Sequence, residues 1–293
     1  MDKLQPPAAF DLRPEHGEST PRAVAVLATD AVGDSEIPPH SHRRGQLIHA
    51  ISGVMIVRAE AGSWVVPPGR GAWVPPGMVH GIRMAGDVRM RTVFVEPGTR
   101  AGLGADCRVI AVDALLRELI VSAIALPLDY ARGGRDERVM ELILDEIERA
   151  PALSLHVPMP RHARLSALCE ELVRDPALPA TLEAWAKRLH MNARTLARLF
   201  QRETGMNFGA WCRQARLLLS LPRLAAGASI LEVALAHGYE SPSAYAAMFR
   251  RTLGMPPSQY LQAPGPAEGA GSARPLSART RGRAARARPR ARR

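Results

Sequence analysis

Three histidines and a glutamine have the residue types and the spacing of a metal site. His40 and His42 lie two residues apart in "PPHSHRRGQLIHA", so an extended strand would point both side chains to one face. Gln46 follows four residues later, and His80 lies further along the chain. Imidazole nitrogens bind Zn, Fe, Mn or Ni, whereas the neutral amide of Gln46 is a weaker ligand than a carboxylate. These residues predict a metal site, a metal-free polar pocket or a structural histidine cluster.

The residues around the histidines are arranged as short strands. Residues 21–96 contain apolar runs such as "AVAVLAT", "QLIHAISGVMIVRAE" and "VRMRTVFVEP", separated by Gly and Pro. β-Branched residues between turn signals are typical of an antiparallel sandwich or barrel. We therefore expect an all-β unit over residues 21–110, preceded by an N-terminal arm over residues 1–20.

The pattern changes to helical spacing after the β unit. Residues 113–126 and 136–149 repeat apolar side chains at helical intervals, which predicts a helical linker over residues 111–160. Its apolar stripes either pack back on the β unit or form a dimer interface. The segment "SLHVPMP", with two prolines, predicts a hinge before residue 161.

Residues 161–262 contain two copies of a helix, a turn and a second helix. In the first copy, Asn192 is placed to cap a helix whose inner face carries Leu196 and Phe200. Arginines recur every four residues on the outer face, as in a helix that enters the DNA major groove. The helix that connects the two copies contains Pro222, which predicts that this helix ends early.

The outer faces of the two second helices supply the candidate DNA contacts. Arginine matches guanine edges and phosphate oxygens, so the first helix is expected to read bases. The expected base contacts there are Arg194, Thr195 and Arg198. The second helix presents small side chains that read little sequence: Ser243, Ala244 and Ala247. The expected phosphate contacts are Arg202, Arg250 and Arg251.

The net charge of +11 is concentrated in the second half of the chain. Residues 1–160 carry 17 basic and 20 acidic side chains, residues 161–262 carry 13 and 7, and residues 263–293 carry nine arginines and one glutamate. This distribution predicts that only the second half meets a polyanion. The last segment has almost no large apolar side chains, so we expect a disordered tail that adds sequence-independent attraction to DNA.

Two broad classes of protein are excluded by the sequence. No apolar run approaches the roughly 20 residues that a bilayer requires, so no membrane contact is expected. The three cysteines are scattered, which argues against a disulfide framework and for a cytoplasmic protein.

The stretch "GYESPSAYAAMFRRTLGMPPSQY" resembles the C-terminal half of the AraC/XylS-type transcription regulators. The matching positions are Gly238, Tyr239, Ser243, Tyr245, Phe249, Arg250, Arg251, Gly254, Pro257 and Tyr260. This resemblance implies two helix-turn-helix units on one linker helix, which bind two successive major-groove segments of double-stranded promoter DNA. A homodimer and a contact with RNA polymerase remain open.

The β unit is similar to a cupin, the small barrel that serves as a sensor in many such regulators. The first cupin motif is matched by Gly33, His40, His42, Gln46 and Gly53, and the second by Gly71, Pro76, Gly77 and His80. The implied α+β chain has an N-terminal cupin-like antiparallel β-barrel and an all-α domain with two helix-turn-helix motifs. Its sensor responds to a small-molecule effector or a metal. The alternative is a metal-dependent cupin enzyme fused to a DNA-binding domain, but no general base accompanies the histidines, so catalysis is not expected.

Overall fold

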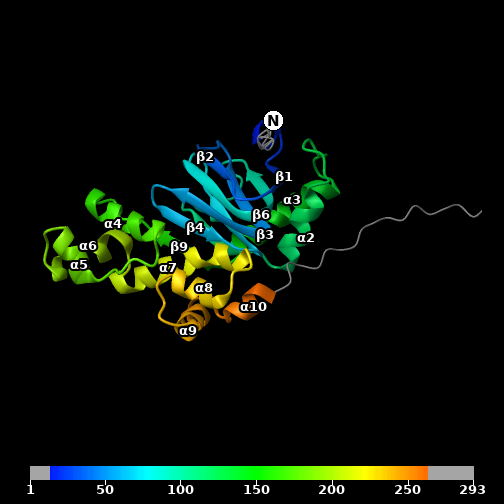
Figure 1. Ribbon diagram of the computed structural model, residues 1–293. Coiled ribbons are helices and arrows are strands. Elements are labelled where there is room, and N and C mark those ends of the chain that lie inside the picture. The colour runs from blue at the N-terminus through cyan, green and yellow to red at the C-terminus, as the bar shows by residue number, and fades with distance from the viewer. Residues whose placement is uncertain (1–13, 263–293) are drawn as a thin grey trace, which may run out of the picture.

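The computed structural model describes residues 14–262 of the 293-residue chain. The expectations for the first part of the N-terminal arm and for the arginine-rich tail fall on residues 1–13 and 263–293, which lie outside the described residues. The short helix α1 (Pro14–Ser19) leads into an antiparallel sheet, and helices follow the sheet (Figure 1). The predicted α+β class is therefore confirmed.

Nine strands of the described chain form one antiparallel sheet. They are β1 (Val24–Ala31), β2 (Glu36–His40), β3 (Gly45–Ala59), β4 (Gly62–Val66), β5 (Arg70–Val74), β6 (His80–Val95), β7 (Arg108–Ala111), β8 (Ala152–Leu153) and β9 (His156–Pro158). The main path runs β1-β6-β3-β5-β7-β8, while β2 pairs with β6 and β4 pairs with β3 and β9. The expected antiparallel unit is present, but hydrogen bonds do not close it into a barrel. The terminal strands β1 and β8 are not paired with each other.

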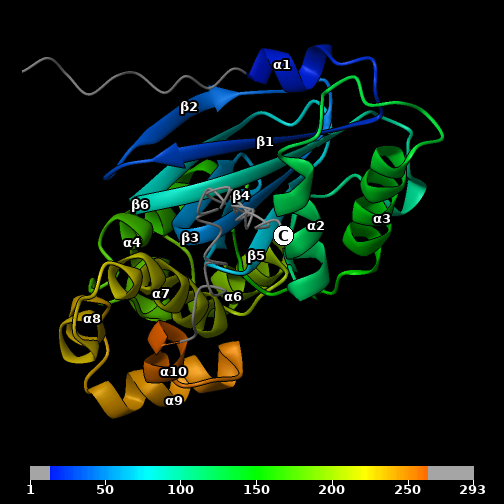
Figure 2. The same cartoon turned by 90° about the vertical axis from the view of Figure 1, so that its right-hand side faces the viewer.

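Two helices cover one face of the sheet. They are α2 (Ala114–Ala123) and α3 (Arg135–Arg149), and a short 3-10 helix η1 (Ala101–Leu103) precedes them. Their buried side chains, including Ile120 and Ile143, share an apolar core with Leu47 and Trp73 of the sheet. Figure 2 shows both helices beside the strands. Of the two expectations for these apolar stripes, packing back on the β unit is what the structure shows.

Seven helices follow the sheet in the described chain. They are α4 (Ala163–Arg174), α5 (Leu182–Arg188), α6 (Ala193–Thr204), α7 (Phe208–Ala225), α8 (Ile230–Ala236), α9 (Pro242–Leu253) and α10 (Pro257–Gln262). The pairs α5–α6 and α8–α9 are the two expected helix-turn-helix units, and α7 connects them. None of the described helices combines the length and the apolar character needed to cross a bilayer.

Local side-chain caps explain where the helices of both units begin. Asn192 and Ser241 each accept a hydrogen bond from a backbone N–H in the first turn of the helix that follows. Ser229 does the same for α8, and the carboxylate of Glu232 accepts in return from the Ser229 backbone N–H. This reciprocal pair is a capping box, which satisfies two backbone donors that the helix leaves free. The predicted cap at Asn192 is confirmed.

Pro222 does not end the connecting helix early, so that prediction is wrong. Helix α7 runs through Pro222 to Ala225. Proline removes one helical hydrogen bond, but only three helical residues follow it here. Leu221 and Leu224 are fully buried, so packing of the last turn against the core offsets the lost bond.

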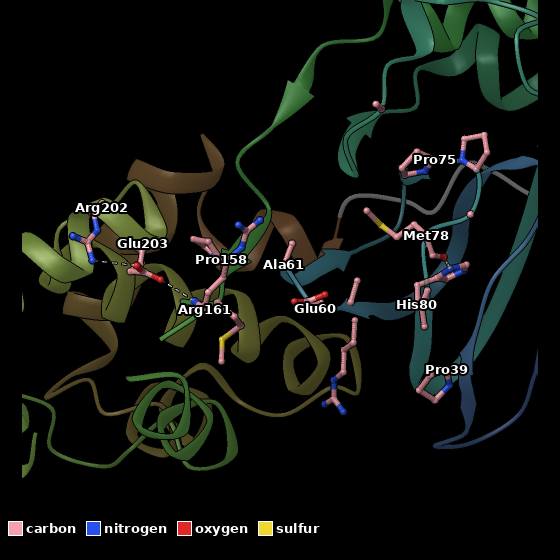
Figure 3. A pocket seen from close by; sticks show the side chains of 17 residues that line it. Pro39, Glu60, Ala61, Pro75, Met78, His80, Pro158, Arg161, Arg202 and Glu203 are labelled. Atoms are coloured by element: carbon pink, nitrogen blue, oxygen red, sulfur yellow. Dashed lines mark hydrogen bonds and ion pairs between the residues drawn. The ribbon is translucent and has the colours of Figure 1, made fainter. Parts of the chain in front are cut away.

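The connecting helix also joins the helical region to the sheet. The Trp211 indole N–H donates to the carbonyl of Pro158 at 2.6 Å, and the Gln214 amide donates to the carbonyl of His156 at 2.5 Å. The predicted hinge therefore contains β9, whose residues are held on one side by β4 and on the other by α7. A cavity of about 1170 Å³ lies beside this junction, between the turn after β3 and the end of α6 (Figure 3).

Candidate histidine cluster and DNA interface

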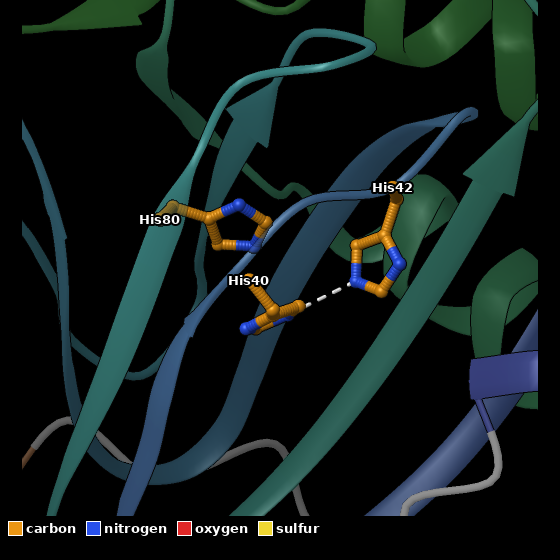
Figure 4. Close-up of side chains that lie close together, drawn as sticks. All are labelled: His40, His42 and His80. Carbon is orange, nitrogen blue, oxygen red and sulfur yellow. Dashed lines mark hydrogen bonds between the residues drawn. The ribbon is translucent and has the colours of Figure 1, made fainter.

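The sheet brings the three predicted metal ligands together. His40 and His80 are paired directly across β2 and β6, and His42 lies just beyond the end of β2. The expectation that both His40 and His42 lie on a strand is therefore wrong for His42, because β2 stops at His40 as the chain turns toward β3. The ligand nitrogens of the three rings nevertheless lie within 4.8 Å of one another (Figure 4).

Hydrogen bonds at the outer nitrogen of each ring fix how the three histidines are protonated. The Nδ1 atom of His40 lies 2.8 Å from the carbonyl of Pro38. The Nδ1 atom of His42 lies 3.0 Å from the carboxylate of Glu18. The Nδ1 atom of His80 lies 3.0 Å from the carbonyl of Met78. An oxygen acceptor at Nδ1 requires the proton to be on Nδ1. Each neutral ring then keeps its lone pair on Nε2. Metal-binding histidines commonly have this arrangement, in which an oxygen acceptor holds the other ring N–H.

The lone pairs of the cluster face one another. The Nε2 atoms of His40 and His42 are 3.1 Å apart, so two acceptors meet unless a proton or a cation lies between them. Two nitrogen ligands of one tetrahedral zinc ion stand roughly 3.3 Å apart when the Zn–N bonds are about 2.0–2.1 Å. This pair therefore already has the spacing of two ligands on one ion, and the ligand nitrogen of His80 lies within 4.8 Å of both. The residues present fit a divalent transition metal.

Gln46 occupies the fourth position of the cluster, as its place in the motif predicts. Its Oε1 lies 3.1 Å from Nε2 of His80, and its side chain is buried. Since His80 donates through Nδ1, its Nε2 accepts, so the Gln46 amide must turn its NH₂ group toward His80 when no metal is bound. With a metal bound, the amide oxygen is free to serve as a neutral fourth ligand.

Burial disfavours the charged forms of two histidines of the cluster, His42 and His80. Desolvation lowers the pKa of His80 to about 4, and desolvation together with the neighbouring His40 lowers the pKa of His42. The Glu18 carboxylate opposes part of the shift at His42. His80 therefore remains neutral, and able to bind a metal, throughout the physiological pH range.

Glu18 is a residue of this site that the sequence pattern did not reveal. It lies 24 residues before His42, in α1, and its carboxylate also accepts from the backbone N–H of Arg43. Gly17 lies so close to the Phe94 ring that a side chain there would clash, so α1 is packed tightly against the sheet. This packing positions Glu18 beside His42. The role of Glu18 depends on how the arm folds, so the sequence pattern alone does not reveal it.

Helix α6 presents its predicted base contacts to solvent. Leu196 and Phe200 are fully buried on its inner face, while all its candidate side chains are exposed: Arg194, Thr195, Arg198 and Arg202. The helix is amphipathic, as its spacing predicts. Its outer face is thus available to a partner.

Helix α9 has the same construction in the second unit. Tyr245 and Phe249 are fully buried, and the candidate residues are exposed: Ser243, Ala244, Ala247, Arg250 and Arg251. Gly254 ends the helix in the left-handed conformation at φ 79°, and Gly205 ends α6 in the same way. The two units therefore begin and end their outward helices by the same local devices.

Comparison with known proteins agrees with both halves of this geometry. Residues 24–147 match the AraC-like ligand binding domain, and residues 185–263 match a helix-turn-helix domain. The HTH-type transcriptional regulator NimR of Escherichia coli K12 is 30% identical over 239 residues, which cover 82% of this chain and 87% of NimR. The chain belongs to the AraC-type family of transcription regulators.

Two further similarities are more distant. The HTH-type transcriptional regulator RipA of Corynebacterium glutamicum is 33% identical over 137 residues, covering 46% of this chain and 40% of RipA. The solved structure of ToxT from Vibrio cholerae is 11% identical, covers 82% of this chain and 98% of that chain, and has a TM-score of 0.35. As an AraC-type regulator, the chain combines a ligand-binding domain with a helix-turn-helix region.

The outward arginines of this AraC-type regulator differ in their partners. Within the described chain, Arg194, Arg198 and Arg250 have no hydrogen-bond or ion-pair partner. Arg202 lies 3.5 Å from the carboxylate of Glu203, a long contact between neighbouring residues. Three guanidinium groups are thus unpaired before any DNA arrives, so DNA binding would not have to break an internal ion pair at these positions.

Proposed function

We propose that this AraC-type regulator binds promoter DNA sequence-specifically by placing α6 and α9 in successive major grooves. The observation that carries the proposal is the exposure of all nine predicted contact residues on two helices whose opposite faces are buried. A regulator of this kind works where the promoter is, in the cytoplasm.

We assign different roles to the two helices. Arg194, Thr195 and Arg198 contact base edges, because a guanidinium group can form two hydrogen bonds with guanine. Arg202, Arg250 and Arg251 bind phosphates and fix the register of the helices on the duplex. The small residues of α9 allow close approach and supply few base contacts, so most of the sequence preference comes from α6.

Replacing Arg198 by Ala tests this assignment. The side chain is exposed and has no partner in the described chain, so its removal should leave the free energy of unfolding unchanged. The substitution should weaken binding to the selected site by about 1–3 kcal/mol and leave binding to the unselected duplex unchanged. The assay is fluorescence anisotropy with a site obtained by selection from random DNA, compared with an unselected duplex.

Arg223→Ala is the matched control, because Arg223 is exposed in the same region but lies outside both recognition helices. It removes the same charge and should affect both duplexes equally and weakly. Equal losses for Arg198→Ala on the specific and the unselected duplex would make Arg198 a phosphate contact and contradict the assignment.

We further propose that the histidine cluster is a sensory site rather than a catalytic one. The three converging Nε2 lone pairs support metal binding, and the bound metal would link the sheet to α1 through His42 and Glu18. Glu18 is engaged by two donors, so it is not free to act as a general base. Turnover of a small substrate by the metal-loaded protein would favour the enzymatic alternative.

The outer faces of α2 and α3 support a proposal of self-association. Leu115, Val121 and Leu142 are exposed although their helices pack well on the other side. The proposal requires that these side chains form one contiguous apolar patch, because such patches mark interfaces between subunits whereas single exposed apolar residues do not. Replacing Leu115 and Leu142 by Glu should convert a dimer into a monomer in sedimentation experiments. A dimer bound at the promoter would be close enough to contact RNA polymerase.

A further inference from the structure

The cavity between the sensor and the first helix-turn-helix unit is a candidate ligand site that borders the histidine cluster at His80. It has a volume of about 1170 Å³, enough for a small organic ligand and water. Figure 3 shows His80 and Met78 on the sensor side and Arg161 with the α6 residues Arg202 and Glu203 on the other side. An occupant would therefore touch both functional parts of the molecule.

The charged residues of the cavity leave one positive charge uncompensated. Arg58, Arg161 and Arg202 line it together with Glu60 and Glu203. Among the described residues, the guanidinium groups of Arg58 and Arg161 have no partner. The carboxylate of Glu203 already accepts hydrogen bonds from the backbone N–H groups of Arg161 and His162, at 3.1 and 3.3 Å. The cavity is thus suited to a ligand that carries a single negative charge.

Apolar side chains line the rest of the cavity. Val79 is 60% exposed and lines this space. Met78, Pro158 and Met159 also contribute to the wall. A ligand with an apolar body would remove this surface from water, which favours its binding.

We propose that the cavity binds an organic monoanion with an apolar body, whose charged group pairs with Arg58 from the sensor and Arg161 from the helical region. Bound there, the anion also attracts the exposed guanidinium group of Arg202 toward the cavity. Arg202 is one of the proposed phosphate contacts, so the anion competes with DNA for it. This consequence at DNA rests on the proposed function, but the binding of the anion does not.

Binding is tested with 1-anilinonaphthalene-8-sulfonate, which is fluorescent in apolar surroundings, and with N-phenyl-1-naphthylamine, which has the same body without the sulfonate. We expect Arg58→Ala and Arg161→Ala each to weaken binding of the sulfonate by about tenfold, the effect of one charge-assisted hydrogen bond. The uncharged amine should bind all proteins alike. The control Arg132→Ala, an exposed arginine in a distant loop, should not change either affinity.

Two results would overturn the proposal. One is an unchanged affinity for the sulfonate in both cavity variants. The other is an equal loss of the sulfonate and of the uncharged amine, which would show that the substitutions disturb the apolar wall and that charge is not recognised.

The effect on DNA is measured separately, by titrating an unselected duplex at several salt concentrations. The plot of log K against log salt has a negative slope. A saturating amount of the sulfonate should reduce the magnitude of this slope by about 0.9, the value of one lost phosphate contact. Arg202→Ala should lower the slope by the same amount and abolish the effect of the sulfonate. An unchanged slope with the sulfonate bound would refute the competition for Arg202, whereas absence of any DNA binding without it would refute the proposed function instead.

Discussion

A buried pair of hydroxyl groups joins the connecting helix α7 to the second recognition helix α9 and allows a sharp test of the packing. The Ser220 Oγ and the Tyr245 phenol oxygen lie 2.7 Å apart, and both side chains are fully buried. The Ser220 hydroxyl donates to the carbonyl of Leu217 one turn earlier. Ser220 has only one proton to give, so Tyr245 must be the donor in the bond between the two hydroxyls.

This direction predicts unequal effects for the two single substitutions. Tyr245→Phe removes one neutral hydrogen bond and leaves Ser220 with its donor satisfied, which should cost about 1 kcal/mol. Ser220→Ala leaves the buried phenol without a partner, and an unpaired buried donor costs about 1–3 kcal/mol. Ser220→Ala should therefore be the more destabilising change.

The double substitution decides the matter. Adding Tyr245→Phe to Ser220→Ala removes the unpaired phenol, so it should restore stability by about 1 kcal/mol, because replacing both partners by apolar groups is nearly neutral. The assay is guanidinium unfolding of the full chain followed by tryptophan fluorescence. A double variant less stable than Ser220→Ala alone would refute the assigned direction of the bond.

Three further substitutions test the sensor. Gln46→Glu should tighten binding of Zn²⁺ or Ni²⁺ by supplying a carboxylate. Glu18→Gln should weaken it by about 10–100-fold through loss of the partner of His42. Calorimetry measures both affinities, and equal values in the wild type and the two variants would show that the metal does not bind at this cluster. Burial lowers the pKa of His49 from 6.5 to about 4. As the pH falls, His49 is therefore protonated in the unfolded chain before it is protonated in the folded chain. The folded state loses stability as the pH falls from about 6.5 to about 4. His49→Leu should remove its share of that loss, about 3 kcal/mol, in unfolding experiments across this pH range, and an unchanged pH dependence would contradict the assignment.

The helix-turn-helix units were predictable because their determinants are local. Asn192 and Ser229 cap helices within three residues of themselves, and the apolar spacing that includes Leu196 and Phe200 is confined to a single helix. Short-range patterns of this kind are present in the sequence itself. Pro222 shows the limit, because its effect on α7 depended on burial of the last helical turn by residues distant in the sequence.

The histidine cluster was predictable only in part. The motif spacing indicated His40, His42 and His80, but the partner of His42 comes from a helix whose position depends on packing between Gly17 and Phe94. The cavity was not predictable either, because its arginines come from β3 and from residues more than 100 positions further along the chain. The fold brings these charged residues together from distant parts of the chain, so no periodic pattern in the sequence predicts the site.

The apolar core continues from the sheet into the helical region without a break. Buried residues as far apart as Val54 and Phe249 belong to the same cluster, and α7 lies against β3 and β9. A chimaera that joined the DNA-binding helices to an unrelated sensor would expose this shared apolar core to water. Exchange of modules within the family should therefore succeed only when α7 and the strand beneath it are transplanted together.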